Sequence, residues 1–231
     1  MTTPVAPSIA SNLERVRERI AAAGARVGRD PAEVTLIAVT KTWPAETVLE
    51  AINAGVTNLG ENRVQEAVAK ATAVEIATRN SQLATPSWHL IGHLQTNKVR
   101  DALGVFGNIH SVDSEKLLAA ISKSATTPVN IFLEVNVAGE ESKFGLSPNQ
   151  VAGMVELARS LPGIQLTGLM TVAPRASNPE DVRPVFRQLA GLAREHALPH
   201  LSMGMTEDFE IAIEEGATHV RVGRAIFGER Q

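Results

Sequence analysis

The chain has 231 residues, of which 44% are hydrophobic and 20% charged, with a formal net charge of −3. This composition is typical of one soluble globular domain, and the acidic balance argues against a nucleic-acid surface. The absence of cysteine excludes disulfides, thiol nucleophiles and thiolate metal sites. No segment has the length and apolarity of a membrane helix, and residues 1–8 lack the pattern of a signal peptide, so we expect a cytoplasmic protein.

The first predicted element is an amphipathic helix from Ser11 to about Val27, which Asp30-Pro31 ends. After it, short apolar runs alternate with helix-length segments. The expected strands cover residues 34–40, 57–59, 88–91, 108–112, 129–137, 165–172, 200–202 and 219–222. The expected helix starts are Pro44, Glu61 or Asn62, Thr96, Asp113 or Ser114, the capping box Ser147-Pro-Asn-Gln150, Pro179 or Arg183, and Thr206.

Strands separated by helices pair in parallel through right-handed crossovers. Eight such units in a chain of this length fit a (β/α)8 TIM barrel, here with an extra N-terminal helix and one domain over residues 1–231. The rival fold is an open doubly wound sheet, which normally carries a glycine-rich turn after its first strand. The residues after the first predicted strand are Lys41-Thr-Trp-Pro44, so the barrel is favoured.

Lys41 is the most informative single residue, because it ends the uncharged run Val34–Thr40. A lysine at the carboxyl end of a buried strand is partly desolvated, which lowers the pKa of its amine. A neutral amine can attack an aldehyde to form a Schiff base. The alternative is a lysine that extends to the rim of the barrel and has no chemical role.

Two turns supply a possible phosphate site, because the loops after strands seven and eight of such barrels often bind phosphate. The seventh strand ends in Ser202-Met203-Gly204-Met205, directly before a helix start, and the eighth ends in Arg221-Val-Gly223-Arg224. Either glycine alone could mark an ordinary tight turn. Together with Lys41 on the neighbouring first strand, they predict one site for an aldehyde that carries a phosphate.

Several motifs give the chain a close resemblance to a known family. They are Ala38-Val-Thr-Lys41, Leu59-Gly-Glu-Asn62, Trp88-His-Leu-Ile-Gly-His-Leu-Gln95 with Asn97-Lys98, Glu141-Ser-Lys143 with Gly145, Ser202-Met-Gly-Met205 and His219-Val-Arg-Val-Gly223. The chain resembles the pyridoxal phosphate homeostasis proteins, single-domain barrels related to the cofactor domain of alanine racemase. The resemblance extends over nearly the whole length, and residues 88–98 are the most specific part of it.

The resemblance implies that Lys41 carries pyridoxal 5'-phosphate as a Schiff base. Ser202, with Met203 and Gly204 in the same turn, and Gly223, with the backbone of Arg224, would hold the phosphate. Relatives commonly have a small hydroxyl residue at the position of Arg224, so only its backbone contact is carried over. Arg221 would face the pyridine nitrogen, and Asn62 would support the ring or the lysine.

Other candidate residues point to structural roles. His89 and His93 lie in a strand context that denies them a common helical face, so we expect no metal site. His110 and His219 are expected to be strand residues with satisfied hydrogen bonds. Glu207 and Asp208 are expected to stabilise a helix start. Trp43 and Trp88 are expected to be packing residues.

Three functions remain open: a carrier that buffers or delivers pyridoxal phosphate without turnover, an amino-acid racemase, and an aldolase that uses Lys41 on a sugar phosphate. The resembled racemases take a second base, a tyrosine, from a second domain; this sequence has no tyrosine and ends soon after the eighth strand. The cation of Arg221 beside the ring would oppose its protonation and weaken carbanion chemistry. We therefore expect a non-catalytic monomer that passes its cofactor to apo-enzymes and binds neither nucleic acid nor membrane.

Overall fold

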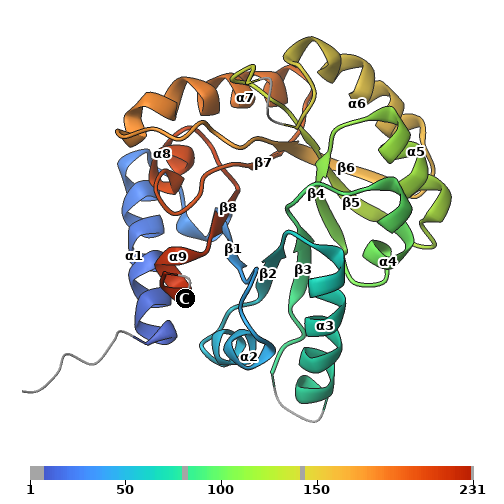
Figure 1. Ribbon diagram of the computed structural model, residues 1–231. Helices are drawn as coiled ribbons and strands as arrows, with labels where there is room; N and C mark the ends of the chain where they lie inside the picture. Colours follow the sequence, from blue (N-terminus) through green and yellow to red (C-terminus); the bar gives the residue numbers. More distant parts are fainter. Residues whose placement is uncertain (1–7, 80–82, 141–143, 230–231) are drawn as a thin grey trace, which may run out of the picture.

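Eight parallel strands close into a barrel in their sequence order, and helices surround it (Figure 1). The computed structural model describes residues 8–79, 83–140 and 144–229. The strands are β1 Thr35–Val39, β2 Asn58–Glu61, β3 Ser87–Leu90, β4 Asn108–Val112, β5 Val129–Glu134, β6 Ile164–Met170, β7 His200–Ser202 and β8 His219–Val222. The predicted TIM barrel is confirmed, and β4, β7 and β8 have the predicted bounds.

The α-helices of the described residues alternate with these strands. They are α1 Ile9–Arg26, α2 Ala45–Asn53, α3 Val64–Thr78, α4 Val99–Leu103, α5 Glu115–Ser124, α6 Val151–Ser160, α7 Arg183–Glu195, α8 Phe209–Glu214 and α9 Arg224–Phe227. None of the helices in the described ranges combines the length and apolarity that a bilayer crossing requires.

Local signals explain most of the helix starts. Pro44 occupies the N-cap position of α2, and the hydroxyl of Ser114 caps α5 by accepting from the Leu117 N–H. The capping box of Ser147 and Gln150 is present. Both starts predicted for the helix after the sixth strand, Pro179 and Arg183, occur, because a 3₁₀ turn at Pro179–Val182 leads into α7.

Two predicted helix starts were wrong. Helix α3 begins at Val64, because β2 continues through Glu61, whose carbonyl accepts the N–H of Ile91 at 2.9 Å. Helix α8 begins at Phe209 with Asp208 as N-cap, and Thr206 lies in a turn before it. The side chain of Asp208 closes that turn by accepting the Met205 N–H at 2.6 Å. As a result, Asn62 lies in the loop after β2 and Thr206 in the loop after β7.

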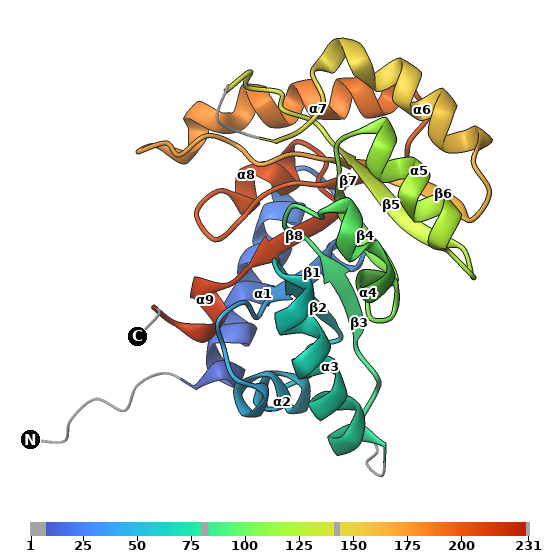
Figure 2. The same cartoon turned by 45° about the vertical axis from the view of Figure 1, so that its right-hand side comes forward.

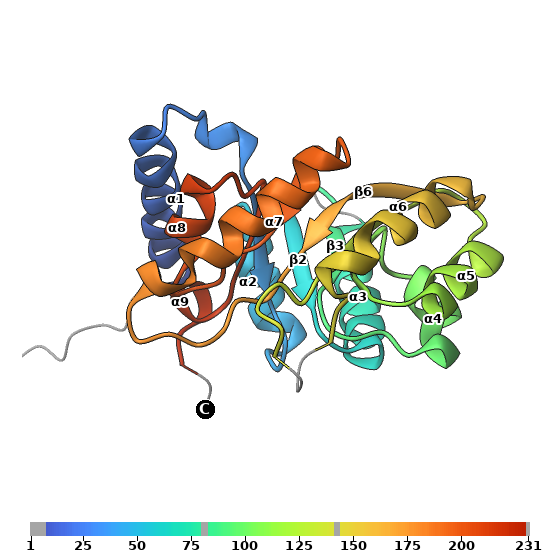
Figure 3. The ribbon, with the colours of Figure 1, turned by 90° about the horizontal axis from the view of Figure 1, so that it is seen from above.

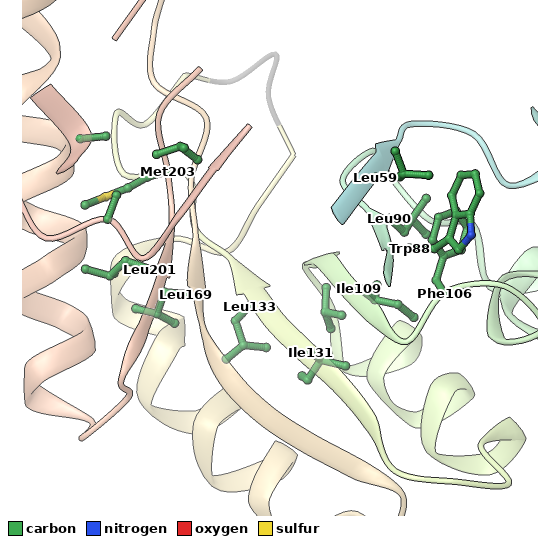
Figure 4. Close-up of a cluster of buried hydrophobic side chains, with 14 of the residues drawn as sticks. Leu59, Trp88, Leu90, Phe106, Ile109, Ile131, Leu133, Leu169, Leu201 and Met203 are labelled. Atoms are coloured by element: carbon green, nitrogen blue, oxygen red, sulfur yellow. The ribbon is translucent and has the colours of Figure 1, made fainter. Parts of the chain in front are cut away.

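The hydrophobic core lies mainly between the outer face of the barrel and the helices. Leu59, Leu90 and Trp88 gather with Phe106 in one part of it, as Figure 4 shows. Alternate strand residues point the other way: a Cβ on Gly60 would lie 2.8 Å from the side chain of Ile37. One face of each strand therefore packs against the helices, and the other lines the interior of the barrel below its mouth.

Helix α1 is the predicted extra N-terminal helix, and it lies beside α8 and α9 at one side of the barrel (Figures 2 and 3). Ion pairs of Arg19 with Glu210, at 2.6 Å, and of Arg26 with Glu214, at 2.5 Å, join α1 to α8. The amide of Asn12 donates to the carbonyl of Ile226 in α9 at 2.9 Å. These contacts bring the two ends of the described chain together.

Candidate functional site

A pocket of about 720 Å³ lies at the carboxyl ends of β1, β2 and β8. Its other walls come from residues 172–176, which follow β6, and residues 205–208, which follow β7. Five of the predicted site residues line it, namely Lys41, Asn62, Arg221, Gly223 and Arg224. Residues far apart in the sequence thus meet where barrel enzymes and binding proteins place their ligands.

Lys41 lies two residues after the end of β1 and is half-buried in the pocket wall. The pairing of β1 with β2 continues one residue beyond the strand, because the Thr40 N–H donates to the Gly60 carbonyl at 3.0 Å. Trp43 lines the pocket beside Lys41, and its ring packs 5.9 Å from that of Phe227. The packing role predicted for Trp43 is confirmed, as is that of Trp88, which is buried in the core.

Asn62 follows β2 and presents an unused acceptor. Its Oδ1 atom is buried and has no hydrogen-bond partner among the described residues. The backbone of Asn62 packs against Gly92, where an added Cβ would lie 2.4 Å from the Asn62 carbonyl oxygen. A buried amide oxygen without a donor is costly unless a ligand supplies one. Asn62 is therefore suited to accept a hydrogen bond from a bound hydroxyl.

Arg221 on β8 brings a cation to the lining of the pocket. It is 4% exposed, and its guanidinium donates to Ser202 Oγ at 2.7 Å and to the Thr171 carbonyl at 2.8 Å. Burial lowers the pKa of Arg221 to about 10, so the group stays charged at neutral pH. The geometry fixes a positive charge that can face an uncharged ring nitrogen or an anionic group.

A chain of hydrogen bonds through the barrel interior holds this arginine. It runs from Arg221 to Ser202 Oγ, then at 2.8 Å to His110 Nδ1, from His110 Nε2 at 2.9 Å to His89 Nδ1, and from His89 Nε2 at 3.1 Å to Asn58 Oδ1. Burial lowers the pKa of His89 to about 4 and that of His110 well below its usual range, so both rings are neutral at neutral pH.

The groups at the two ends of this series of hydrogen bonds determine which atom donates at each step. The guanidinium can only donate and Asn58 Oδ1 can only accept, so each neutral ring carries its proton on Nε2 and accepts at Nδ1. The hydroxyl proton of Ser202 is then committed to His110. The predicted structural role of His110 is confirmed, and that of His219 likewise, because its Nδ1 lies 2.9 Å from the Thr218 hydroxyl.

Strand β8 turns into α9 at Gly223, which occupies the N-cap position. The Gly223 carbonyl accepts the N–H groups of Ile226 and Phe227, at 2.9 and 3.0 Å. The N–H groups of Arg224 and Ala225 precede these first intrahelical bonds, as expected at a helix start. The guanidinium of Arg224 pairs with Glu207 at 2.7 Å, and both residues belong to the pocket lining.

Comparisons with known proteins identify the family of this chain. Residues 11–231 match the family model described as alanine racemase, N-terminal domain. The protein named pyridoxal phosphate homeostasis protein in Aquifex aeolicus is 45% identical over 228 residues, which cover 95% of this chain and 97% of that relative. The mouse protein of the same name is 38% identical over 237 residues, covering 94% of this chain and 85% of its own. The chain belongs to the pyridoxal phosphate homeostasis protein family.

Solved structures support the assignment to this family. PipY of Synechococcus elongatus, solved with pyridoxal phosphate bound, has 34% sequence identity and a TM-score of 0.79, with 96% of this chain and 100% of that chain covered. A protein from Bifidobacterium adolescentis has 39% identity and a TM-score of 0.88, with 95% and 94% covered. An alanine racemase from Corynebacterium glutamicum, at 15% identity, a TM-score of 0.65 and coverage of 94% and 62%, shares the fold.

Three of the residues predicted to hold the phosphate do not line this pocket. Ser202, Met203 and Gly204 are buried outside the pocket lining. Gly204 has φ +91°, and a Cβ there would lie 2.6 Å from that of Ala212, so this glycine admits helix α8. Met203 belongs to the hydrophobic core (Figure 4). Their contact with phosphate stays a prediction.

The residue with a hydroxyl that does line the pocket is Thr206, which was predicted from the sequence to be a helix cap. Its position two residues before the true N-cap, Asp208, was the missed signal. The prediction for Asp208 as part of a helix start is confirmed, whereas Glu207 pairs with Arg224. The family motif Glu141-Ser-Lys143 lies outside the described residues. Within the described part, no group of three or more His, Asp or Glu side chains is arranged to hold a metal ion.

Proposed function

We propose that this chain binds pyridoxal 5'-phosphate on Lys41 as a Schiff base and buffers or delivers it without turning over a substrate of its own. The amine of Lys41, once deprotonated, attacks the aldehyde carbon, and water leaves as the C=N bond forms. The observation that carries the proposal is the convergence of a lysine amine, a buried cation and an unused acceptor in one pocket.

The donors and acceptors of the pocket match the groups of the cofactor. Its volume of about 720 Å³ is within the range typical of small-molecule sites. Arg221 would face the ring nitrogen, and Asn62 Oδ1 would accept from the ring hydroxyl. The hydroxyl of Thr206 and the N–H groups of Arg224 and Ala225 would meet the phosphate. The names of the curated relatives and the bound ligand of PipY support this match.

Bound pyridoxal phosphate supplies an electrophilic carbonyl and a ring that can withdraw electrons, and the surroundings of Arg221 limit the second property. The guanidinium and the neutral histidine chain behind it offer no proton to the ring nitrogen. An unprotonated ring is a weak electron sink, so abstraction of a proton from an amino acid is disfavoured. The sequence also has no tyrosine to serve as a second base. These features favour a carrier over a racemase.

Incubation with single amino acids in deuterated water separates the two functions. A carrier exchanges the α-hydrogen slowly at most and keeps the optical purity of the amino acid, but it restores activity to an apo-enzyme that depends on pyridoxal phosphate. Rapid exchange with racemisation of one amino acid would overturn the carrier function and make this chain a minimal racemase. Light scattering of the same sample tests the monomer that we also propose.

A further inference from the structure

A buried ion cluster lies directly behind Lys41, outside the pocket. Lys70 on α3 is 6% exposed, and its Nζ donates to the Thr40 carbonyl at 2.6 Å and to one carboxylate oxygen each of Glu61 and Glu66 at 2.7 Å. The Thr40 hydroxyl also donates to Glu61, at 2.6 Å. A buried ammonium is costly, and the face that α3 turns to the core already holds apolar residues. Packing alone therefore does not explain why these charges are buried.

The cluster holds the peptide groups on both sides of Lys41. The carbonyl of Thr40, immediately before it, accepts from Lys70, and the N–H of Thr42, immediately after it, donates to Glu66 Oε1. Because Glu66 Oε1 also accepts from Lys70, both flanking contacts depend on one shared pair of charges. The Thr40 carbonyl also accepts the N–H of Trp43 at 3.1 Å, so the cluster acts on a turn that begins at Thr40.

The backbone at this point has an uncommon conformation. Thr42 has φ +70°, in the left-handed region that β-branched residues rarely adopt. Such a conformation persists only where its surroundings determine it. The carboxylate of Glu66 supplies that determinant, and the hydrogen bonds from Lys70 and from the Thr42 N–H lower its pKa although burial alone would raise it.

We propose that Lys70 and Glu66 are positioning residues that fix the backbone of Lys41 so that its amine enters the pocket in the orientation needed to attack an aldehyde. This inference rests on the proposed attachment of the cofactor to Lys41. Neither residue lines the pocket, so neither would contact the ligand. Their effect should appear in the rate of capture of the aldehyde and not in the affinity for the rest of the cofactor.

The test compares two ligands on purified apo-protein. Pyridoxal 5'-phosphate reports capture, followed by stopped-flow absorbance, and pyridoxine 5'-phosphate, which has no aldehyde, reports non-covalent binding by calorimetry. In Lys70→Met and Glu66→Leu, capture should slow on the order of tenfold to a hundredfold, as for a misplaced reacting group. The Kd for pyridoxine 5'-phosphate should stay within about twofold of the wild-type value.

Two further variants make the comparison specific. Glu66→Gln keeps an acceptor for the Thr42 N–H and should recover part of the lost rate. Glu75→Gln removes the exposed pair of Glu75 with Arg79 on the same helix, where the side chains are 66% and 68% exposed, and should capture at the wild-type rate. Should Lys70→Met fail to fold, Glu66→Leu decides, because that side chain is already 24% exposed.

Unchanged capture by folded Lys70→Met or Glu66→Leu would overturn the positioning role. A parallel loss of affinity for pyridoxine 5'-phosphate would overturn it too, since the cluster would then support the pocket as a whole. A wild-type chain that binds pyridoxine 5'-phosphate but captures no aldehyde at Lys41 would instead contradict the proposed function itself.

Discussion

Ser202 and Thr206 divide between them the role that a single hydroxyl was expected to fill. The Ser202 hydroxyl is fully buried and lies between the guanidinium of Arg221 and the ring of His110. Thr206 lies four residues later and lines the pocket. We propose that the first hydroxyl supports Arg221 and that the second contacts the phosphate of the ligand.

Removal of the two hydroxyls is expected to affect different quantities, ligand affinity in one case and stability in the other. Thr206→Val should weaken the binding of pyridoxal 5'-phosphate by about 1.5–3 kcal/mol, because it removes a hydrogen bond to a charged acceptor. Ser202→Ala should change that affinity much less but lower the free energy of unfolding by roughly 1–3 kcal/mol, since buried donors and acceptors lose their partner. Ligand titration and urea unfolding of both variants measure the two quantities.

The control ligand is pyridoxal, which lacks the phosphate and should bind equally well to Thr206→Val and to the wild-type protein. A large loss of affinity in Ser202→Ala, with none in Thr206→Val, would return the phosphate contact to Ser202 and contradict the assignment made from the pocket lining.

At the scale of elements, an ion network ties α7 to α8. Arg183 donates to Glu180 at 2.7 Å, to Glu214 at 2.6 Å and to Glu215 at 2.9 Å. The side chains of Glu214 and Glu215 are only 13% and 12% exposed, so they are screened less than surface groups. Glu214 also pairs with Arg26, which extends the network to α1.

Arg183→Gln should lower the free energy of unfolding by roughly 1–2 kcal/mol, because two partly buried carboxylates lose a shared cation. Arg79→Gln, in the exposed pair with Glu75, is the matched control and should have a much smaller effect. Denaturant unfolding at low and high salt provides the measurement. An equal loss in both variants would show that the network adds nothing beyond ordinary surface pairs.

The order of these elements could be predicted from the sequence because strands and helices alternate with clear apolar runs and caps. The correct bounds of β4, β7 and β8 followed from such runs. Thr206 was misassigned because a turn at residues 205–208, closed by the bond from the Met205 N–H to the Asp208 carboxylate, delays the start of α8 to Phe209. The ion pair of Lys70 with Glu61 could not be foreseen, since the two residues lie on different elements and meet only where α3 packs back on β2.

On the scale of the whole molecule, the histidine chain links stability to pH. His89 has an ordinary pKa of 6.5 that burial lowers to about 4 in the folded chain. Between these values the unfolded chain binds a proton that the folded chain does not, so stability is lost as the pH falls from 6.5 towards 4. The lowered pKa corresponds to roughly 3 kcal/mol.

The free energy of unfolding should therefore fall more steeply below pH 6.5 in the wild-type protein than in His89→Asn. Burial raises the pKa of Glu134 to about 7, which acts in the opposite direction, because stability from that group is lost as the pH rises from about 4.5 to 7. The difference between the two proteins removes this shared contribution. Urea unfolding between pH 5 and 7.5 gives the slope of the free energy of unfolding against pH for each protein. Equal slopes would show that His89 does not contribute to the pH dependence of stability.

The attachment of pyridoxal 5'-phosphate to Lys41 is the claim on which the proposed function depends, and reduction with borohydride tests it most directly. The loaded protein should absorb near the wavelength of a protonated Schiff base, lose that band on reduction, and carry one pyridoxyl group on the peptide that contains Lys41. Lys41→Ala should show no band and no label. A pyridoxyl group on Lys98, or a label that persists in Lys41→Ala, would contradict the account.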